Sequence, residues 1–147
     1  MKQEKIEILL KNKQLNKKSI DKQLAISLLE SAEDTAETAL SIELIDKKAT
    51  SIFRELYEAI RQLGEASWHL LGYESKNHDV SLEILKDLDF LNGGQKVKLN
   101  FLERFKTLRH RANYQGFKIL TSQAKEIIYF WSFVGKDILA YLKKQSR

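Results

Sequence analysis

The sequence predicts an all-α protein, built as an antiparallel up-and-down bundle of four to five helices. Apolar residues recur every three or four positions in four long segments, and no segment alternates as a strand does. The chain has six glycines and no proline, which favours long uninterrupted helices. Its length suits one domain over residues 1–147, which opens with a basic segment at residues 1–18, and short connections favour antiparallel neighbours.

The first half of the chain contains one weak helix and two strong ones. The weak helix covers residues 5–11, and a long helix follows over residues 19–44 with Ser19 as its N-cap. Its apolar stripe steps by four through Ile20, Leu24, Leu28, Ala32, Ala36 and Leu40. A second long helix covers residues 49–71, and Gly72 stands where a helix-ending glycine belongs.

In the middle of the chain, the sequence predicts a short helix and a third long helix. The short helix covers residues 81–91, with Asp79 or Ser81 as its cap, and "LNGGQ" after it is a turn. The long helix covers residues 94–112, and its apolar stripe is Val97, Phe101, Phe105, Leu108 and Ala112.

The last helix covers residues 121–145, with Thr121 or Ser122 as its cap. Phe130, Phe133 and Tyr141 lie off its main apolar stripe. A helix that is apolar nearly all round is either central in a bundle or part of an interface between subunits.

Composition excludes several classes of protein. The absence of cysteine excludes disulfides, thiolate metal sites and thiol nucleophiles, and it fits a reducing cytoplasm. The first residues alternate charged and apolar side chains, and no segment has the apolar run of a signal peptide or a membrane span. We therefore expect a cytoplasmic protein that makes no membrane contact.

Charge is distributed unevenly behind a net value of +5. Residues 19–91 carry seven Lys and Arg against fifteen Asp and Glu, whereas residues 92–147 carry twelve against three. A basic face of this kind can meet phosphates, an acidic partner or a second copy of the chain. Solvated helix surfaces that differ in charge without a function explain the same counts.

The sequence offers no metal or cofactor site. Its three histidines, His69, His78 and His110, include no pair at i, i+4, and "HDVSLE" is a mixture common at helix starts. Gly-rich phosphate loops and nucleophile motifs are also missing. We expect neither a metal nor a cofactor.

The stretch "RHRANY" is the candidate site. Arg109 follows Phe105 by four positions, so we expect its stem to pack at the edge of the apolar stripe while its guanidinium is presented. Asn113 lies one turn further along that edge, and His110 and Tyr114 are one turn apart on the neighbouring edge. Cations that cap a helix C-terminus explain part of this pattern.

The surrounding window is the most basic part of the chain. Residues 96–118 contain seven cations, and Glu103 is the one acid among them. The cations closest to the motif are Arg104, Lys106, Arg111 and Lys118, which we expect to contact nucleic acid together with Asn113.

On these residues the chain resembles the HEPN superfamily, the small helical bundles found in toxin–antitoxin pairs and in RNA-cleaving effectors. "RHRANY" is similar to its signature, an arginine followed by a polar residue and, several residues later, a histidine. Arg109 matches the arginine and His110 the polar residue, while Tyr114 stands where ribonuclease members have histidine. A helix that ends in Gly72 and Tyr73 and is followed by His78 is a second point of similarity.

The resemblance implies a homodimer in which two signature helices form a basic cleft for RNA. Arg109, His110 and Tyr114 would then be the catalytic positions of a metal-independent ribonuclease. Because a phenol with a pKa near 10 exchanges protons poorly at neutral pH, we expect cleavage to be slow or absent. The extra apolar residues of the last helix and the opposite charges of the two chain halves also favour a homodimer.

Two other functions stay open. The chain would serve as a non-catalytic subunit of a minimal nucleotidyltransferase of the antitoxin type, with Tyr114 as the residue that the partner modifies. Alternatively, "RHRANY" is purely structural, with Arg109 paired to an acid of the helix over residues 19–44 or of the helix over residues 49–71, for example Glu58 or Glu65.

Overall fold

The computed structural model describes all 147 residues and is mainly helical, as predicted. The elements in chain order are α1 (Gln3–Lys11), β1 (Leu15–Lys17), α2 (Lys22–Leu40), the 3₁₀ turn η1 (Asp46–Lys48), α3 (Ala49–Leu71), β2 (Tyr73–Ser75), α4 (His78–Glu83), the 3₁₀ turn η2 (Ile84–Asp87), α5 (Gly93–Lys98), α6 (Phe101–Tyr114), α7 (Thr121–Phe130), the π-helical turn η3 (Trp131–Gly135) and α8 (Lys136–Gln145).

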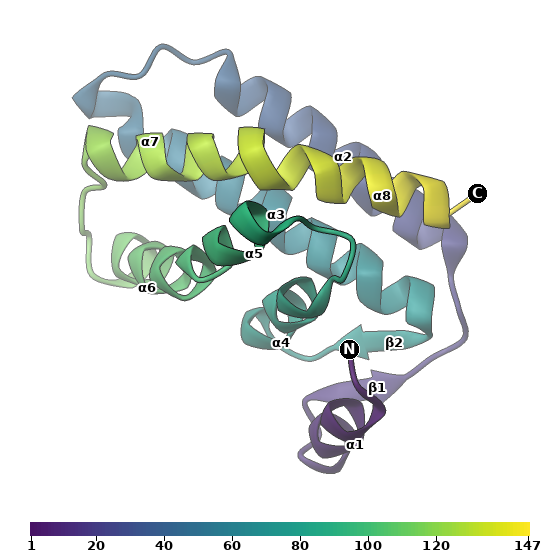
Figure 1. Cartoon of the computed structure of the whole chain (residues 1–147). Helices are drawn as coiled ribbons and strands as arrows, with labels where there is room; N and C mark the ends of the chain where they lie inside the picture. The colour runs from purple at the N-terminus through teal and green to yellow at the C-terminus, as the bar shows by residue number, and fades with distance from the viewer.

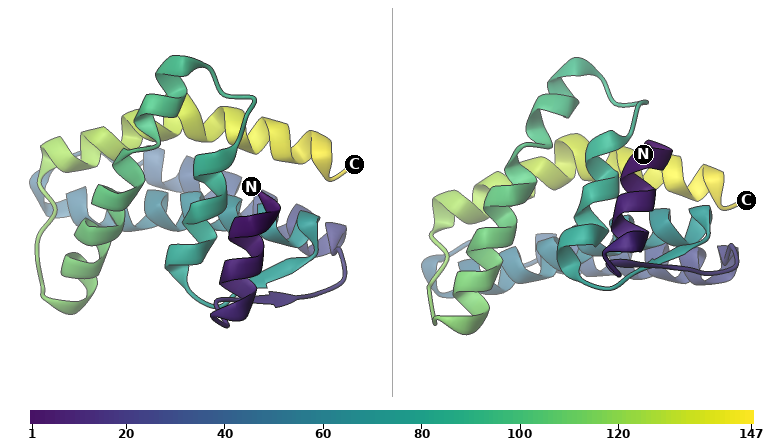
Figure 2. Two further views of the ribbon diagram at one scale, coloured as in Figure 1. Left: turned by 60° about the horizontal axis from the view of Figure 1, so that its bottom comes forward. Right: turned by 90° about the horizontal axis from the view of Figure 1, so that it is seen from below.

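Three long helical runs lie side by side, and the shorter helices α1, α4 and α6 stand in a row across them (Figures 1 and 2). The Lys22 ammonium lies 3.4 Å from the backbone oxygen of Arg147, so α2 and α8 run in opposite directions. The Ile119 N–H donates to the Thr50 hydroxyl at 3.0 Å, so α3 and the α7–α8 run begin at the same end. The parallel course of these two runs departs from the predicted up-and-down order, because α4 to α6 carry the chain back across α3.

Helix α2 packs on α3 through a face of small residues. The buried positions are Ala25, Leu29, Ala32, Ala36 and Ala39, whereas Ile20, Leu24 and Leu40 of the predicted stripe are exposed. Of the predicted stripe, Ala32 and Ala36 are buried and Leu28 packs partly against the core, whereas the prediction is wrong for the other three residues. Alanine has no mobile side chain to order and allows the two helices to approach closely. The N-cap is Asp21, whose carboxylate accepts from the Leu24 N–H at 3.0 Å, rather than Ser19.

Helix α3 is the centre of the core and buries residues along nearly its whole length. It ends, as predicted, at Gly72, which has a left-handed φ of 88°. At Gly64 the backbone of Ser81 approaches so closely that an added Cβ would lie 1.8 Å from the Ser81 carbonyl oxygen. The Trp68 indole N–H also donates to the Val80 carbonyl at 2.8 Å. These contacts fix the start of α4 against α3.

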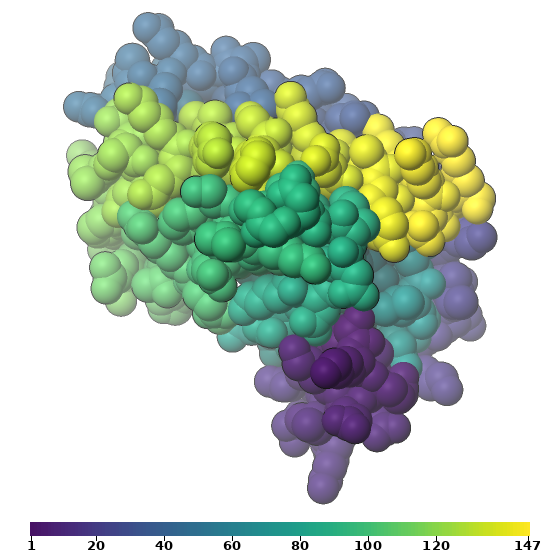
Figure 3. Space-filling view, viewed as in Figure 1, coloured from purple at the N-terminus to yellow at the C-terminus, as the bar shows by residue number.

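A two-stranded antiparallel pair joins the N-terminal segment to the body. Leu15 pairs with Ser75 and Lys17 with Tyr73. The expectation of a chain without strands is therefore wrong in this detail, because strands of three residues are too short to show an alternation. The pair holds α1, which projects from the body in Figure 3.

The predicted helix over residues 94–112 is divided into α5 and α6 at Leu99 and Asn100. Because α5 is a separate segment, its Val97 is 65% exposed rather than part of the core stripe. Asn92 caps α5 by accepting from the Gln95 N–H at 2.9 Å, and the Gln95 side chain accepts from the Asn92 N–H at 3.1 Å. The turn predicted at "LNGGQ" is therefore the start of a helix.

The caps of two further helices also differ from the prediction. Asn77 caps α4 by accepting from the Val80 N–H at 3.0 Å, in place of Asp79 or Ser81. Before α7, the Leu120 N–H donates to the Gln123 side chain at 2.9 Å.

The off-stripe aromatic residues of the last helical run are covered within the chain. The Phe130 ring meets Phe105 edge-on at 5.6 Å, and the Tyr141 ring stacks on Phe90 at 4.1 Å. Phe130 is buried, whereas Tyr141 and Phe133 are partly buried, so contacts within the chain account for much of this apolar surface. The homodimer stays a prediction. No helix combines the length and apolar character that crossing a membrane requires.

Candidate nucleic-acid interface at the end of helix α6

Helix α6 lies across α3 and buries one side of its length. Leu102, Phe105, Leu108 and Ala112 form the buried side, and the Phe105 ring meets Phe53 of α3 edge-on at 5.8 Å. The side chains of the "RHRANY" stretch therefore emerge at the edge of this contact and beyond it.

The C-terminus of α6 is closed without the cations of the motif. Arg54 of α3 donates to the Ala112 carbonyl at 2.9 Å. The Arg111 carbonyl accepts from the backbone N–H groups of Gln115 and Phe117, and Gly116 takes a left-handed φ of 65°. Capping therefore does not account for the side chains of Arg109, His110 or Arg111.

Arg109 is half-buried, and its guanidinium carbon lies 5.5 Å from the centre of the Tyr57 ring. No carboxylate lies within ion-pair distance of it. Glu58 and Glu65, the acids considered for the structural reading, both pair with Arg61, at 2.7 and 3.4 Å. Arg109 thus rests on an aromatic ring, and its positive charge has no acidic partner.

His110 and Tyr114 lie one turn apart, as predicted, with ring centres separated by 4.9 Å. Both are exposed, and Tyr114 is 71% accessible to solvent. The exposed pair can stack on a base or accept a modification, since nothing covers the phenol.

The five predicted nucleic-acid contacts divide into two groups. Arg111, Asn113 and Lys118 are exposed and make no ion pair or side-chain hydrogen bond within the chain. Arg104 pairs with Glu126 at 2.7 Å, and Lys106 pairs with Glu103 at 2.9 Å and with Asp79 at 3.6 Å. Arg104 and Lys106 are therefore neutralised by acids, two of which come from other helices and could not be counted in the sequence window.

The fold brings Tyr57 and His78 to Arg109, and neither residue was among the predicted site residues. Tyr57 is fully buried and its hydroxyl has no hydrogen-bond partner, while His78 is half-buried with its Nδ1 unpartnered. Tyr57 looked like one more member of the apolar stripe of α3. His78 had a signal in the sequence, since it follows the Gly-Tyr helix end that supports the family resemblance.

The two groups share one electrostatic environment. Burial raises the pKa of Tyr57 to about 12, and the positive charge of Arg109 opposes this rise. Burial also lowers the pKa of His78, and the charges of Arg61 and Arg109 lower it further. At neutral pH the corner therefore holds a neutral phenol, a neutral imidazole and a free guanidinium.

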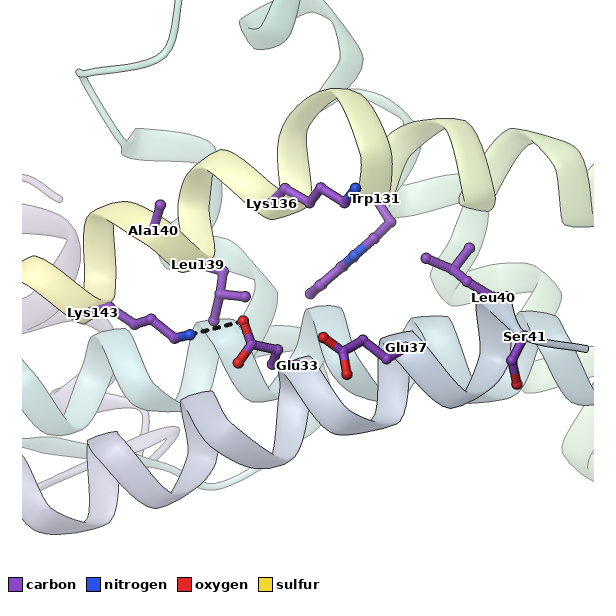
Figure 4. A pocket seen from close by; sticks show the side chains of 9 residues that line it. All are labelled: Glu33, Glu37, Leu40, Ser41, Trp131, Lys136, Leu139, Ala140 and Lys143. Carbon is purple, nitrogen blue, oxygen red and sulfur yellow. Dashed lines mark hydrogen bonds and ion pairs between the residues drawn. The ribbon is translucent and has the colours of Figure 1, made fainter.

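The larger hollows of the surface lie elsewhere. One of about 570 Å³ lies between α2 and α8 and contains Trp131, Glu37 and the ion pair of Glu33 with Lys143 (Figure 4). Another of about 580 Å³ is mainly apolar and lies near Phe90 and Tyr141. Neither hollow is lined by residues of the "RHRANY" stretch, and no group of three or more His, Asp or Glu side chains is placed to hold a metal ion.

Comparisons with known proteins give no match: no protein-family model, no curated protein and no solved structure matches the chain.

Proposed function

We propose that the chain binds single-stranded RNA through its phosphates at the end of α6, as a HEPN-like subunit of the toxin type. The observation that carries the proposal is Arg109, a half-buried guanidinium that rests on Tyr57 and has no carboxylate partner. A cation held in this way has lost part of its hydration and gains most from a charge-assisted contact with an anion. Exposed Arg111 and Lys118 add charge near it, and exposed Tyr114 adds a ring for a base.

In the proposed homodimer, the α6 ends of two copies face each other and form one basic cleft. We propose that metal-independent cleavage in this cleft is weak or absent, because Tyr114 stands where a proton-transferring histidine is expected. His110 lies beside Tyr114, but it is exposed and contacts no other polar side chain.

The test is fluorescence anisotropy with a labelled single-stranded RNA at two salt concentrations. Arg109→Ala should weaken binding by about 1–3 kcal/mol, since it removes a charge-assisted contact. Arg104→Ala is the matched control, an arginine of the same helix whose charge Glu126 already neutralises. Loss of RNA binding in both variants alike would point to general charge attraction, and absence of binding in the wild type would refute the proposal.

The exposure of Tyr114 favours a second candidate function, that of an accessory subunit of a nucleotidyltransferase. The phenol would lose its proton to solvent, and its oxygen would attack the α-phosphate of a nucleoside triphosphate. The bond between the α- and β-phosphates would break and release pyrophosphate, which leaves a nucleotide on Tyr114. Intact-mass measurement of the chain purified with its native partner should then show one added nucleotide that Tyr114→Phe abolishes. An unmodified mass in the presence of partner and nucleoside triphosphate would exclude this function.

A further inference from the structure

We propose that His78 and Tyr57 complete, together with Arg109, a small site for one phosphate oxyanion. The inference takes its ligand class from the proposed function, since the phosphate would be that of a bound RNA. It adds two residues from α3 and α4 to a site that the sequence placed on α6 alone.

Three contacts bring the residues together. The backbone contact between Gly64 and Ser81 fixes α4 against α3. Asp79, next to His78, lies 3.6 Å from the Lys106 ammonium, and Lys106 precedes Arg109 by about one turn of α6. Arg109 in turn lies over Tyr57. Each of the three helices is therefore tied to the other two at this corner.

A fully buried polar atom at the corner, the Tyr57 hydroxyl, has no partner in the chain. Buried polar groups in native proteins are almost always hydrogen-bonded, so an unpartnered group calls for a water or a ligand. A phenol that burial keeps protonated is a spare O–H donor, and an oxyanion is the acceptor that gains most from it.

The imidazole of His78 can supply a further donor. Its Nδ1 is buried without any acceptor, whereas its Nε2 is neither hydrogen-bonded nor among the buried unpartnered atoms. A buried N–H without an acceptor is costlier than an unshared lone pair, which favours the tautomer with the proton on Nε2. The Nε2–H is then a donor that is neither buried nor hydrogen-bonded within the chain.

The balance of charge selects an anion rather than a cation. The carboxylates that act on His78 and Tyr57 are Glu58 and Asp79, and each already has a cation partner, Arg61 and Lys106 respectively. Arg109 is the cation left without a counter-charge. A phosphate at the corner would neutralise it and would stabilise the protonated form of His78.

The experiment is a titration of the full chain with inorganic phosphate, followed by NMR of the histidine Cε1–H signals. His69, His78 and His110 are assigned with single His→Gln variants. We expect the His78 signal to shift saturably and its pKa to rise on phosphate addition, while the signal of buried His69 stays in place. Chloride at matched ionic strength should leave the His78 signal unchanged.

Variants test two members of the site, Tyr57 and Arg109. Tyr57→Phe keeps the ring under Arg109 and removes only the hydroxyl, and it should weaken phosphate binding severalfold. Arg109→Ala should weaken it by about tenfold or more, the scale of one charge-assisted hydrogen bond. Arg104→Ala should have no effect, because its cation is already paired.

The outcomes separate this inference from the proposed function. A His78 signal that ignores phosphate, or that moves equally with chloride, overturns the inference. If RNA still binds in that case and depends on Arg109, the proposed function stands without the additional site. If phosphate shifts His78 but RNA does not bind, the oxyanion site stands and its ligand is a free phosphate or a small phosphate ester.

Discussion

Two arginines at the same corner of the molecule have opposite surroundings. Arg61 on α3 forms ion pairs with Glu58 and Glu65, so its charge is neutralised within the fold. Arg109 on α6 lies over an aromatic ring and has no acid within reach. The difference teaches that position in a basic window does not identify an unpaired cation, since Arg104 and Lys106 in that window are paired.

The largest expected effect comes from moving the helix that supplies His78. Gly64→Ala places a methyl group 1.8 Å from the Ser81 carbonyl oxygen, so α4 must move away from α3. We expect a loss of about 3 kcal/mol or more in the free energy of unfolding, measured by urea denaturation. Gly93→Ala is the control, because nothing lies within 4 Å of its added Cβ. Equal stability of the two variants would contradict the close contact.

The two arginines should separate stability from binding. Arg61→Ala leaves Glu58 and Glu65 without their cation and should cost about 1–3 kcal/mol in the free energy of unfolding. Arg109→Ala removes only the contact with the Tyr57 ring and should cost about 0.5–1 kcal/mol. Denaturation curves of both variants measure the contrast. Similar stability losses would mean that Arg109 is as structural as Arg61.

Acid should weaken the ion pairs that Glu103 forms with Lys86 and Lys106. Hydrogen bonds from Lys86 and Lys106 lower the pKa of Glu103 to about 2 from its ordinary value of 4.5. The ordinary pKa of 4.5 applies to the unfolded chain, so the ionised Glu103 stabilises the fold above pH 4.5. This stabilisation is lost as the pH falls from 4.5 towards 2. Thermal unfolding between pH 5 and 2 should show a shallower acid loss for Glu103→Gln than for the wild type or for the exposed control Glu30→Gln.

The smallest expected effect concerns the unpartnered phenol. Tyr57→Phe removes a buried hydroxyl that has no partner in the free chain, so the free energy of unfolding should rise by up to about 1 kcal/mol. Thermal denaturation without phosphate measures this change. A clear loss of stability would show that the hydroxyl has a partner in the folded chain, and it would remove one support of the oxyanion site.

The predictable part of the fold is the part with strong helical periodicity. The spacing of apolar residues identified α3 and its end at Gly72, because periodicity and a left-handed glycine are local signals. The spacing gave the wrong buried side for part of α2. Ile20, Leu24 and Leu40 are more hydrophobic than alanine, but the alanines pack more closely and are the buried residues. The division at Leu99 and Asn100 leaves α5 against η3, where the Gln95 side chain donates to the Phe133 carbonyl, a contact between distant segments that no local signal records.

Only the part of the candidate site that lies on α6 could be predicted from the sequence. Periodicity placed Arg109 at the edge of the buried stripe, and the structure shows it there, half-buried. The partners of the basic residues come from other helices, as Glu126 does for Arg104 and Asp79 for Lys106. Tyr57 could not be separated from the core residues around it, since a buried hydroxyl without a partner is a property of three-dimensional packing.

The π-helical turn at Trp131–Gly135 has a consequence for how this chain tolerates change in length. Such a turn corresponds to one residue inserted into an α-helix, and each residue of an α-helix advances the phase by about 100°. The turn absorbs the extra residue, and Ala124 and Ile127 before it and Ile138 and Leu142 after it are all buried. Deleting one residue of the turn should therefore restore a regular helix and leave the apolar side of α8 against the core.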